Sequence, residues 1–307
     1  MSNDFHSIDT DHPEAPIIEA SEAKPSANKG KSKSCLWLNG LWVIPVIVVM
    51  YFLFRSPFVV KGTTLVKYRG FAAEVVIPEG VTKIGKLAFA ECRSLTSVVI
   101  PKGVTEIESF AFQDCTSLTS IEIPEGVTKI GDYTFGCCRS LTSVVLPESM
   151  TKIEACTFHG CSSLTSVVIS ESVTEIEAGA FEYCSSLTSV EIPKGVKEIE
   201  SHAFYSCSSL TSVVFPKAVM RIDEYAFSCC SSLTSVVIPE GVTKIGTGAF
   251  KSCEFLTSVE IPESVTKIGG CAFDGCPKLT IHAPAGSYAE QYAKENNIPF
   301  EIKSTNP

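Results

Sequence analysis

The sequence predicts an α/β solenoid, a coil of short repeated turns that share one continuous core. A phenylalanine returns every 23 residues from Phe89 to Phe273, and a cysteine follows each one three places later. Self-similarity at a fixed period of 20–50 residues is typical of repeat proteins, in which each turn buries its apolar face against its neighbours. We therefore expect one domain of about nine turns. The structural ladder of this fold comprises Phe89, Phe112, Phe135, Phe158, Phe181, Phe204, Phe227, Phe250 and Phe273, with Cys92, Cys115, Cys138, Cys161, Cys184, Cys207, Cys230, Cys253 and Cys276.

Each turn begins with a strand pattern and ends at the phenylalanine. In 118–124 (LTSIEIP) aliphatic residues alternate with polar ones, which predicts a strand with one buried face, and the proline ends the ladder. Val127 and Ile130 then turn inward, and a short helical turn around Phe135 returns the chain to Cys138. The turns are therefore predicted to stack with a parallel sheet on one face and short helical turns on the other.

The segment before the repeats divides into a polar tail and an apolar stretch. Residues 1–34 hold six acidic residues and four lysines with little apolar content, so we expect a disordered tail. Residues 36–54 carry no formal charge, and nineteen helical residues span about 28 Å, close to the hydrocarbon thickness of a bilayer. We predict a transmembrane helix over 35–55. A cleaved signal peptide and a buried soluble helix are the alternatives, and the lysines and arginines on the two sides balance, so charge does not set the orientation.

The remaining segments predict caps at the two ends of the array. We expect residues 56–74 to form a linker and an N-terminal cap, in which a strand at 65–68 covers the first turn. Residues 75–281 form the solenoid, and residues 282–307 form a C-terminal cap. In that cap 287–297 (SYAEQYAKENN) predicts an amphipathic helix with Ser287 as its N-cap, and 298–302 predicts a final strand.

Composition and motifs argue against several functions. The formal net charge of −9 and the isoelectric point near 5.2 oppose nucleic-acid binding. No nucleophile elbow, phosphate-binding loop, dinucleotide-binding glycine pattern or paired-carboxylate arrangement is present, so we expect no enzyme, no catalytic residue, no cofactor and no small-molecule substrate. Cys156, His159 and Cys161 resemble half of a zinc site, but Cys161 belongs to the ladder and no second pair follows, so we expect no metal.

The other cysteines carry a separate expectation. Neighbouring ladder cysteines would lie about 5 Å apart with parallel Cβ vectors, so buried free thiols are favoured over a disulfide framework. Outside the ladder, Cys137, Cys156, Cys229 and Cys271 are expected to face outward and to be the most reactive thiols.

Two surfaces are candidates for binding. The predicted sheet face repeats Thr, Ser and Val, and β-propensity with repeat duplication explains that uniformity better than the alternative, a flat surface for an extended ligand. The two positions after each ladder phenylalanine vary instead, and variation between repeats often marks the binding face. We place the candidate site there, with neutral variation of an exposed rim as the alternative. The candidate residues are His159, Glu182, Tyr183, His202 and Tyr205.

The phrase C-x-x-L-T-S-V-x-I-P-x-x-V-T-x-I-x-x-x-A-F resembles the BspA-like class of leucine-rich repeats, whose units are also 23 residues long. The likeness covers residues 75–279, and it implies a right-handed leucine-rich repeat solenoid used for adhesion or protein binding outside the cell. We expect a single-pass membrane protein, held in its own membrane by residues 36–54, whose extracellular repeats bind an unknown protein or extracellular ligand. The alternative is a structural spacer or intracellular scaffold without a specific ligand.

Overall fold

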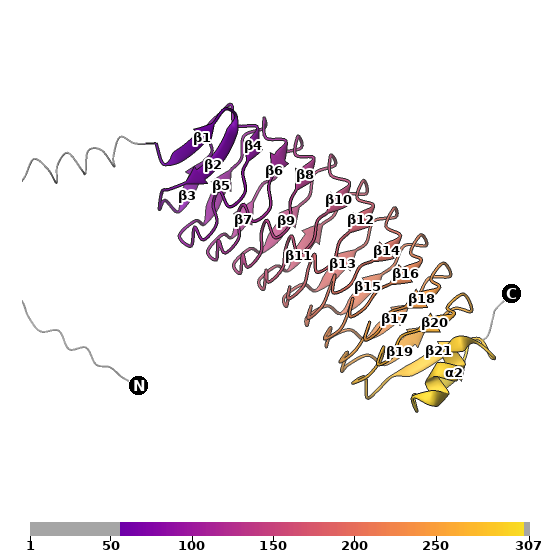
Figure 1. Ribbon diagram of the computed structural model, residues 1–307. Coiled ribbons are helices and arrows are strands. Elements are labelled where there is room, and N and C mark those ends of the chain that lie inside the picture. The colour runs from indigo at the N-terminus through magenta and orange to yellow at the C-terminus, as the bar shows by residue number, and fades with distance from the viewer. Residues whose placement is uncertain (1–55, 304–307) are drawn as a thin grey trace, which may run out of the picture. The chain divides into compact units, whose positions relative to one another are not determined.

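A computed structural model describes residues 56–303, which form a repeat solenoid of about ten turns stacked in a row (Figure 1). The predicted tail over 1–34 and the predicted transmembrane helix over 35–55 lie outside the described residues. Between residues 56 and 303 no helix has the length and apolar character needed to cross a membrane. The buried apolar residues of all turns form one continuous core.

The first series of strands has the sequence Ser-Val-Val or a close variant and corresponds to the predicted sheet. Paired strands run parallel with a register of one repeat, so that Val75 lies beside Val98, and the series is divided into three separate hydrogen-bonded sheets. The central residue of each strand turns toward the core and its neighbours turn outward, because side chains alternate along a strand. The series comprises β3 (Glu74–Val76), β5 (Ser97–Val99), β7 (Ser120–Ile121), β9 (Ser143–Val145), β11 (Ser166–Val168), β13 (Ser189–Glu191), β15 (Ser212–Val214), β17 (Ser235–Val237) and β19 (Ser258–Glu260).

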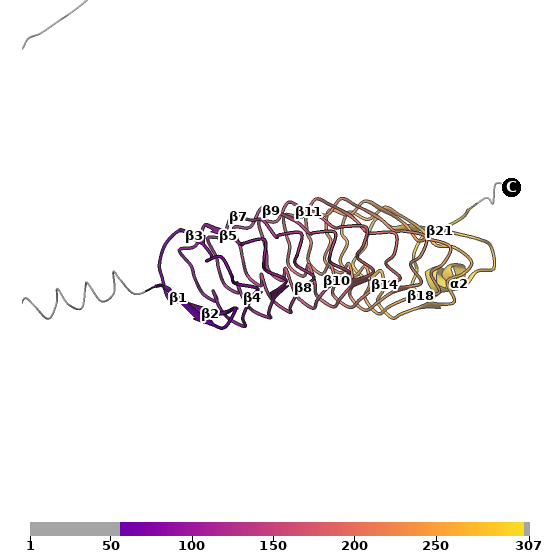
Figure 2. The same ribbon diagram turned by 90° about the horizontal axis from the view of Figure 1, so that it is seen from above.

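A second series of parallel strands, which the sequence analysis did not predict, runs along another side of the coil (Figure 2). Each strand has only two residues, a charged residue and a buried isoleucine, and Ile153 pairs with Ile176. Every turn therefore contributes one strand to each of the two series, and each series is divided into separate hydrogen-bonded sheets. The series comprises β4 (Lys83–Ile84), β6 (Glu106–Ile107), β8 (Lys129–Ile130), β10 (Lys152–Ile153), β12 (Glu175–Ile176), β14 (Glu198–Ile199), β16 (Arg221–Ile222), β18 (Lys244–Ile245) and β20 (Lys267–Ile268).

The prediction of short helical turns around the phenylalanines is wrong. In every turn the residue two places before the phenylalanine and the residue two places after it have left-handed backbone conformations, as Phe110 (φ 63°) and Asp114 (φ 57°) do around Phe112. A right-handed helix cannot contain such residues. The amides of Phe110, Phe112 and Asp114 instead donate to carbonyl groups of the next turn at 2.8–2.9 Å. This segment is therefore a third hydrogen-bonded ladder between the turns.

The phenylalanines and cysteines of the repeat fill the centre of the solenoid. Consecutive phenylalanine rings stack with centroids 4.9–5.6 Å apart and planes within 12° of parallel. From Cys115 to Cys276 each thiol donates to the carbonyl oxygen of the phenylalanine 26 residues earlier, as Cys184 does to Phe158 at 3.2 Å. From Cys115 to Cys253 each thiol thus adds a second donor to a carbonyl oxygen that already accepts a hydrogen bond from the amide of the cysteine three residues after it, as Phe158 does from Cys161 at 3.1 Å. This explains a small thiol at the position better than apolar burial alone.

The N-terminal end of the core is covered by an antiparallel hairpin of β1 (Phe58–Lys61) and β2 (Thr64–Tyr68). The Tyr68 ring stacks on Phe89 at 5.1 Å, and the Tyr68 amide donates to Ala88 at 2.8 Å. The tyrosine ring thereby extends the stack of phenylalanine rings and covers its N-terminal end.

The C-terminal end is covered by β21 (Thr280–Ala283), α2 (Tyr288–Glu295) and β22 (Phe300–Ile302), which pairs in parallel with β21. Ser287 caps α2 by accepting a hydrogen bond from the Glu290 amide. Tyr292 of α2 meets Phe273 edge to face at 6.1 Å, so a tyrosine ends the stack here as well. α2 is the one α-helix within residues 56–303.

Candidate binding surface

Three positions around each ladder phenylalanine carry side chains that differ from turn to turn. They are the second position before the phenylalanine, the first after it and the second after it. His159, Glu182 and Tyr205 occupy the first position after, Tyr183 the second after and His202 the second before. Backbone amide and carbonyl groups at these positions form hydrogen bonds with the neighbouring turns. The backbone that carries the variable side chains is therefore held in place.

The structure brings all five predicted residues into one connected cluster. His159 Nδ1 lies 3.3 Å from Glu182 Oε2, and the His159 ring meets Tyr183 edge to face at 5.4 Å. Tyr183 meets Tyr205 in the same way at 5.4 Å, and Tyr205 lies 5.4 Å from the ring of His202. Tyr183 is 45% exposed and the other four are partly buried.

Three further aromatic residues extend this cluster along the solenoid, and the sequence analysis missed them. Tyr133 lies 5.5 Å from His159, Phe110 stacks on Tyr133 at 5.5 Å, and Tyr225 stacks on His202 at 5.2 Å. All three occupy the second position before a ladder phenylalanine. The sequence analysis compared only the two positions after it. The resulting aromatic ridge comprises Phe110, Tyr133, His159, Tyr183, Tyr205, His202 and Tyr225.

Most of the aromatic ridge is built on strained backbone. Phe110, Tyr133, Tyr183, His202 and Tyr225 all have left-handed conformations with φ between 52° and 63°. A bulky residue in this region costs about 1–2 kcal/mol relative to a favourable backbone conformation, and glycine avoids most of that cost. Glycine does occupy equivalent positions in other turns, at Gly248 for example. The ridge therefore retains large rings where glycine would leave the backbone less strained.

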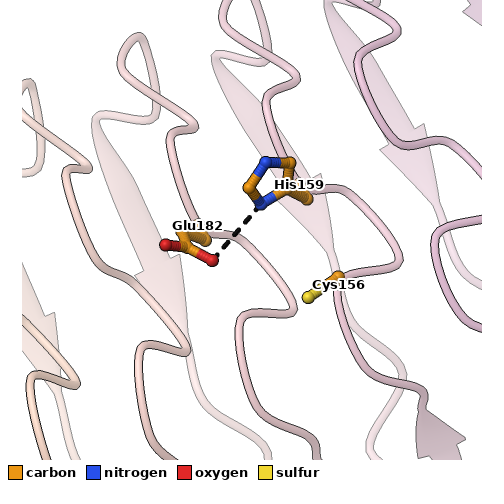
Figure 3. Close-up of side chains that lie close together, drawn as sticks. All are labelled: Cys156, His159 and Glu182. Carbon is orange, nitrogen blue, oxygen red and sulfur yellow. Dashed lines mark hydrogen bonds and ion pairs between the residues drawn. The ribbon is translucent and has the colours of Figure 1, made fainter. Parts of the chain in front are cut away.

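The polar centre of the ridge contains a thiol as well as an imidazole and a carboxylate (Figure 3). Cys156, His159 and Glu182 come from two adjacent turns, and their side chains converge on one another. A hydrogen bond with Cys156 and partial burial raise the pKa of Tyr133 to about 12. Burial also raises the pKa of the Cys156 thiol, although the bond with Tyr133 opposes this. Near neutral pH the phenol and the thiol are therefore both uncharged.

The threonines of the sheet face serve the fold itself. The hydroxyl group of each threonine from Thr96 to Thr257 donates to a carbonyl oxygen of the preceding turn, as Thr142 does to Thr119 at 3.2 Å. These donors are already used between the turns, which favours the structural explanation of the threonine repeat. The valines beside them are 57–69% exposed and are Val76, Val99, Val145, Val168, Val214 and Val237. Glutamates replace them at Glu122, Glu191 and Glu260.

Cysteines outside the ladder differ in exposure. Cys271 is exposed, as predicted. The other three, Cys137, Cys156 and Cys229, are partly buried, so they are less exposed than predicted. Cys161 is fully buried and donates to the carbonyl oxygen of Phe135 at 3.1 Å. Cys161 is therefore not available as a ligand beside Cys156 and His159.

The stacked turns, with one core phenylalanine and one strand pair each, define a leucine-rich repeat protein. The family description "BspA type leucine rich repeat region" matches residues 68–184 and 151–280, which together are more than half of the chain. The chain therefore belongs to the BspA-type leucine-rich repeat family.

The chain is also similar to solved structures. A leucine-rich repeat protein from Bacteroides ovatus is 27% identical with a TM-score of 0.61, over 80% of this chain and 74% of that chain. The leucine-rich repeat protein of T. pallidum is 27% identical with a TM-score of 0.43, over 78% and 89% of the two chains. A leucine-rich cell surface protein from Faecalibacterium prausnitzii is 27% identical with a TM-score of 0.34, over 77% and 94%. No curated protein matches the chain.

Proposed function

We propose that this protein binds another protein through the aromatic ridge, and that residues 36–54 hold it in a membrane with the repeats outside the cell. The observation that carries the proposal is the continuous run of aromatic side chains over several turns of a supported backbone ladder. The ridge differs from turn to turn, whereas the sheet face is uniform. A surface that recognises one partner requires such a non-uniform pattern.

The chemistry of the ridge suits protein recognition. Tyrosine, together with tryptophan and arginine, contributes disproportionately to the binding energy of protein interfaces, and aromatic residues are enriched there. The rings already contact one another, so little side-chain entropy remains to be lost when a partner binds. Binding rather than catalysis is therefore the role we assign to the repeats, with adhesion as the cellular consequence.

The binding surface can be tested with paired alanine variants. Full-length protein, kept in detergent micelles, is applied to an array of secreted and cell-surface proteins. We expect any specific partner to bind at least ~10-fold more weakly when Tyr183 and Tyr205 are both replaced by alanine. The matched control replaces Val145 and Val237, which are 60% and 57% exposed on the sheet face. Equal binding by the two double variants would show that the ridge is not the recognition surface.

Membrane display needs a separate experiment. Intact expressing cells are treated with protease, and the repeat array over 75–279 is detected separately from the tail over 1–34. The proposal expects loss of the array and protection of the tail. An array that survives until the cells are opened would refute adhesion and would favour an internal scaffold. The spacer alternative instead expects a cleaved array that binds no partner through either surface.

A further inference from the structure

Cys156, His159 and Glu182 form a cluster of metal-ligating side chains that the recognition of a protein partner does not require. The ligand atoms of all three lie within 4.8 Å of one another, and each side chain is partly buried. Within residues 56–303 no other group of three histidine, cysteine or acidic side chains is this compact. We propose that these three residues bind one divalent transition-metal ion, with zinc as the best-matched metal.

The donor set selects the class of metal. A thiolate, an imidazole and a carboxylate are the three side-chain ligands that zinc uses in proteins, at about 2.0–2.3 Å each. Calcium and magnesium take oxygen ligands almost exclusively, so a sulfur and a nitrogen donor discriminate against them. Two zinc ligands at those lengths in tetrahedral arrangement are roughly 3.4 Å apart. His159 Nδ1 and Glu182 Oε2 are already 3.3 Å apart.

The backbone holds the two contributing turns together at the site. The Cys156 amide donates to Ala178 at 3.0 Å, and the Gly160 amide donates to Glu182 at 2.7 Å. Within the first turn the His159 amide donates to the Cys156 carbonyl at 3.0 Å. Because the first two bonds join the turns and the third fixes Cys156 relative to His159, the ligands need only side-chain rotation to close on a metal. Such preorganisation on regular elements favours metal binding.

A glycine leaves the space in which the three side chains converge. Gly179 lies one repeat after Cys156, at the position that carries a side chain in most turns. A Cβ atom at Gly179 would lie 2.8 Å from Cys156 Sγ and 3.1 Å from Glu182 Oε2. A side chain there would displace Cys156 Sγ and crowd Glu182 Oε2. The open space between them therefore depends on the absence of a side chain at this one position.

From the sequence we expected no metal, because Cys161 belongs to the ladder and no second ligand pair follows at a supporting spacing. Cys161 is indeed unavailable, since it is buried and bonded to Phe135. The third ligand, Glu182, comes from the neighbouring turn, 23 residues after His159. Three protein ligands leave a fourth position open, which a water molecule or a side chain of a bound protein can occupy. Metal binding displaces the thiol proton of Cys156 to solvent.

Cobalt and zinc binding to the full-length, reduced protein in detergent tests the site without any partner. We expect one Co²⁺ per chain and a thiolate-to-cobalt charge-transfer absorption band. Cys156→Ser should abolish that band, and His159→Ala and Glu182→Gln should each weaken Zn²⁺ binding at least ~10-fold in competition with a chromophoric chelator. Cys271→Ser is the matched control, because Cys271 has the equivalent position and a left-handed φ of 56° but is exposed and outside the cluster.

Three results would overturn the proposal. They are the absence of the charge-transfer band from the parent protein, its persistence in Cys156→Ser, and unchanged zinc affinity in both His159→Ala and Glu182→Gln. Glu182→Gln keeps the size of the side chain, and circular dichroism of every variant establishes that the solenoid is folded. Because no partner protein takes part, this experiment can fail while the proposed binding function stands, and the reverse is equally possible.

Discussion

Replacing Phe181 with alanine should destabilise the solenoid more than almost any other single truncation. Phe181 is fully buried and stacks on Phe158 at 5.4 Å and on Phe204 at 5.3 Å. Truncation of a buried phenylalanine to alanine costs about 3–5 kcal/mol through lost transfer energy and the remaining cavity. Two aromatic contacts, each worth ~0.5–1.5 kcal/mol, are lost together, so we expect the upper part of that range.

The position of Phe181 in the middle of the array adds a second expectation. Solenoid stability is a sum of repeat and interface contributions, so a weakened central interface can uncouple the two halves. Urea unfolding followed by circular dichroism should then show a lower midpoint and a shallower or two-step transition. Phe255→Ala is the control, because the Phe255 ring is 52% exposed and has the Lys278 ammonium over it at 4.6 Å.

The outcome that would refute this reasoning is a loss of less than ~1 kcal/mol for Phe181→Ala, the scale expected of the Phe255→Ala control. Such a result would mean that the phenylalanine stack does not hold the turns together. The two sheets and the turn ladder would then have to account for the cohesion of the array.

Two further predictions concern hydrogen bonding and charge. Thr165→Val removes the hydroxyl that donates to Thr142 at 3.1 Å and should lower stability by about 0.5–1.5 kcal/mol in urea, whereas Ser166→Ala on the same exposed face should change little. Burial and the neighbouring Asp223 raise the pKa of Glu200 above its usual 4.5, so the folded state holds that proton more tightly and loses stability as pH rises through the raised value. Glu200→Gln should therefore raise the melting temperature at about pH 7, and equal melting temperatures at pH 7 would contradict this.

The sequence predicted the parts of the fold that depend on burial alone. The period of the phenylalanines and the alternation in 118–124 reflect side chains that repeat toward one core, and such periodicity is visible in a linear sequence. The second sheet has no comparable signature, because strands of two residues such as β10 are too short to show an alternation. The helical turns were wrong for a related reason: hydrophobic spacing does not reveal the left-handed residues on each side of Phe112.

The candidate surface was predicted in outline from the variation between repeats. His159, Glu182, Tyr183, His202 and Tyr205 differ from their counterparts in other turns, and that difference is readable without coordinates. Their contacts with one another are not readable, because neighbours across the ladder are separated by about one repeat and come from positions on both sides of the phenylalanine. Comparing the second position before each phenylalanine would have identified the aromatic residues that were missed.

By itself, the sequence determined that this protein is a solenoid with one core, a fixed period and a phenylalanine and a cysteine in each turn, because buried positions tolerate few residue types. Only the tertiary structure decided that a thiol, an imidazole and a carboxylate of two turns meet beside Gly179. That meeting depends on the left-handed backbone and on hydrogen bonds between turns, and neither leaves a mark in the hydrophobic pattern. The stacking of turns brings His159 and Glu182, 23 residues apart in the sequence, close enough to bind one metal ion. The site therefore forms between two turns and cannot be found in any single repeat.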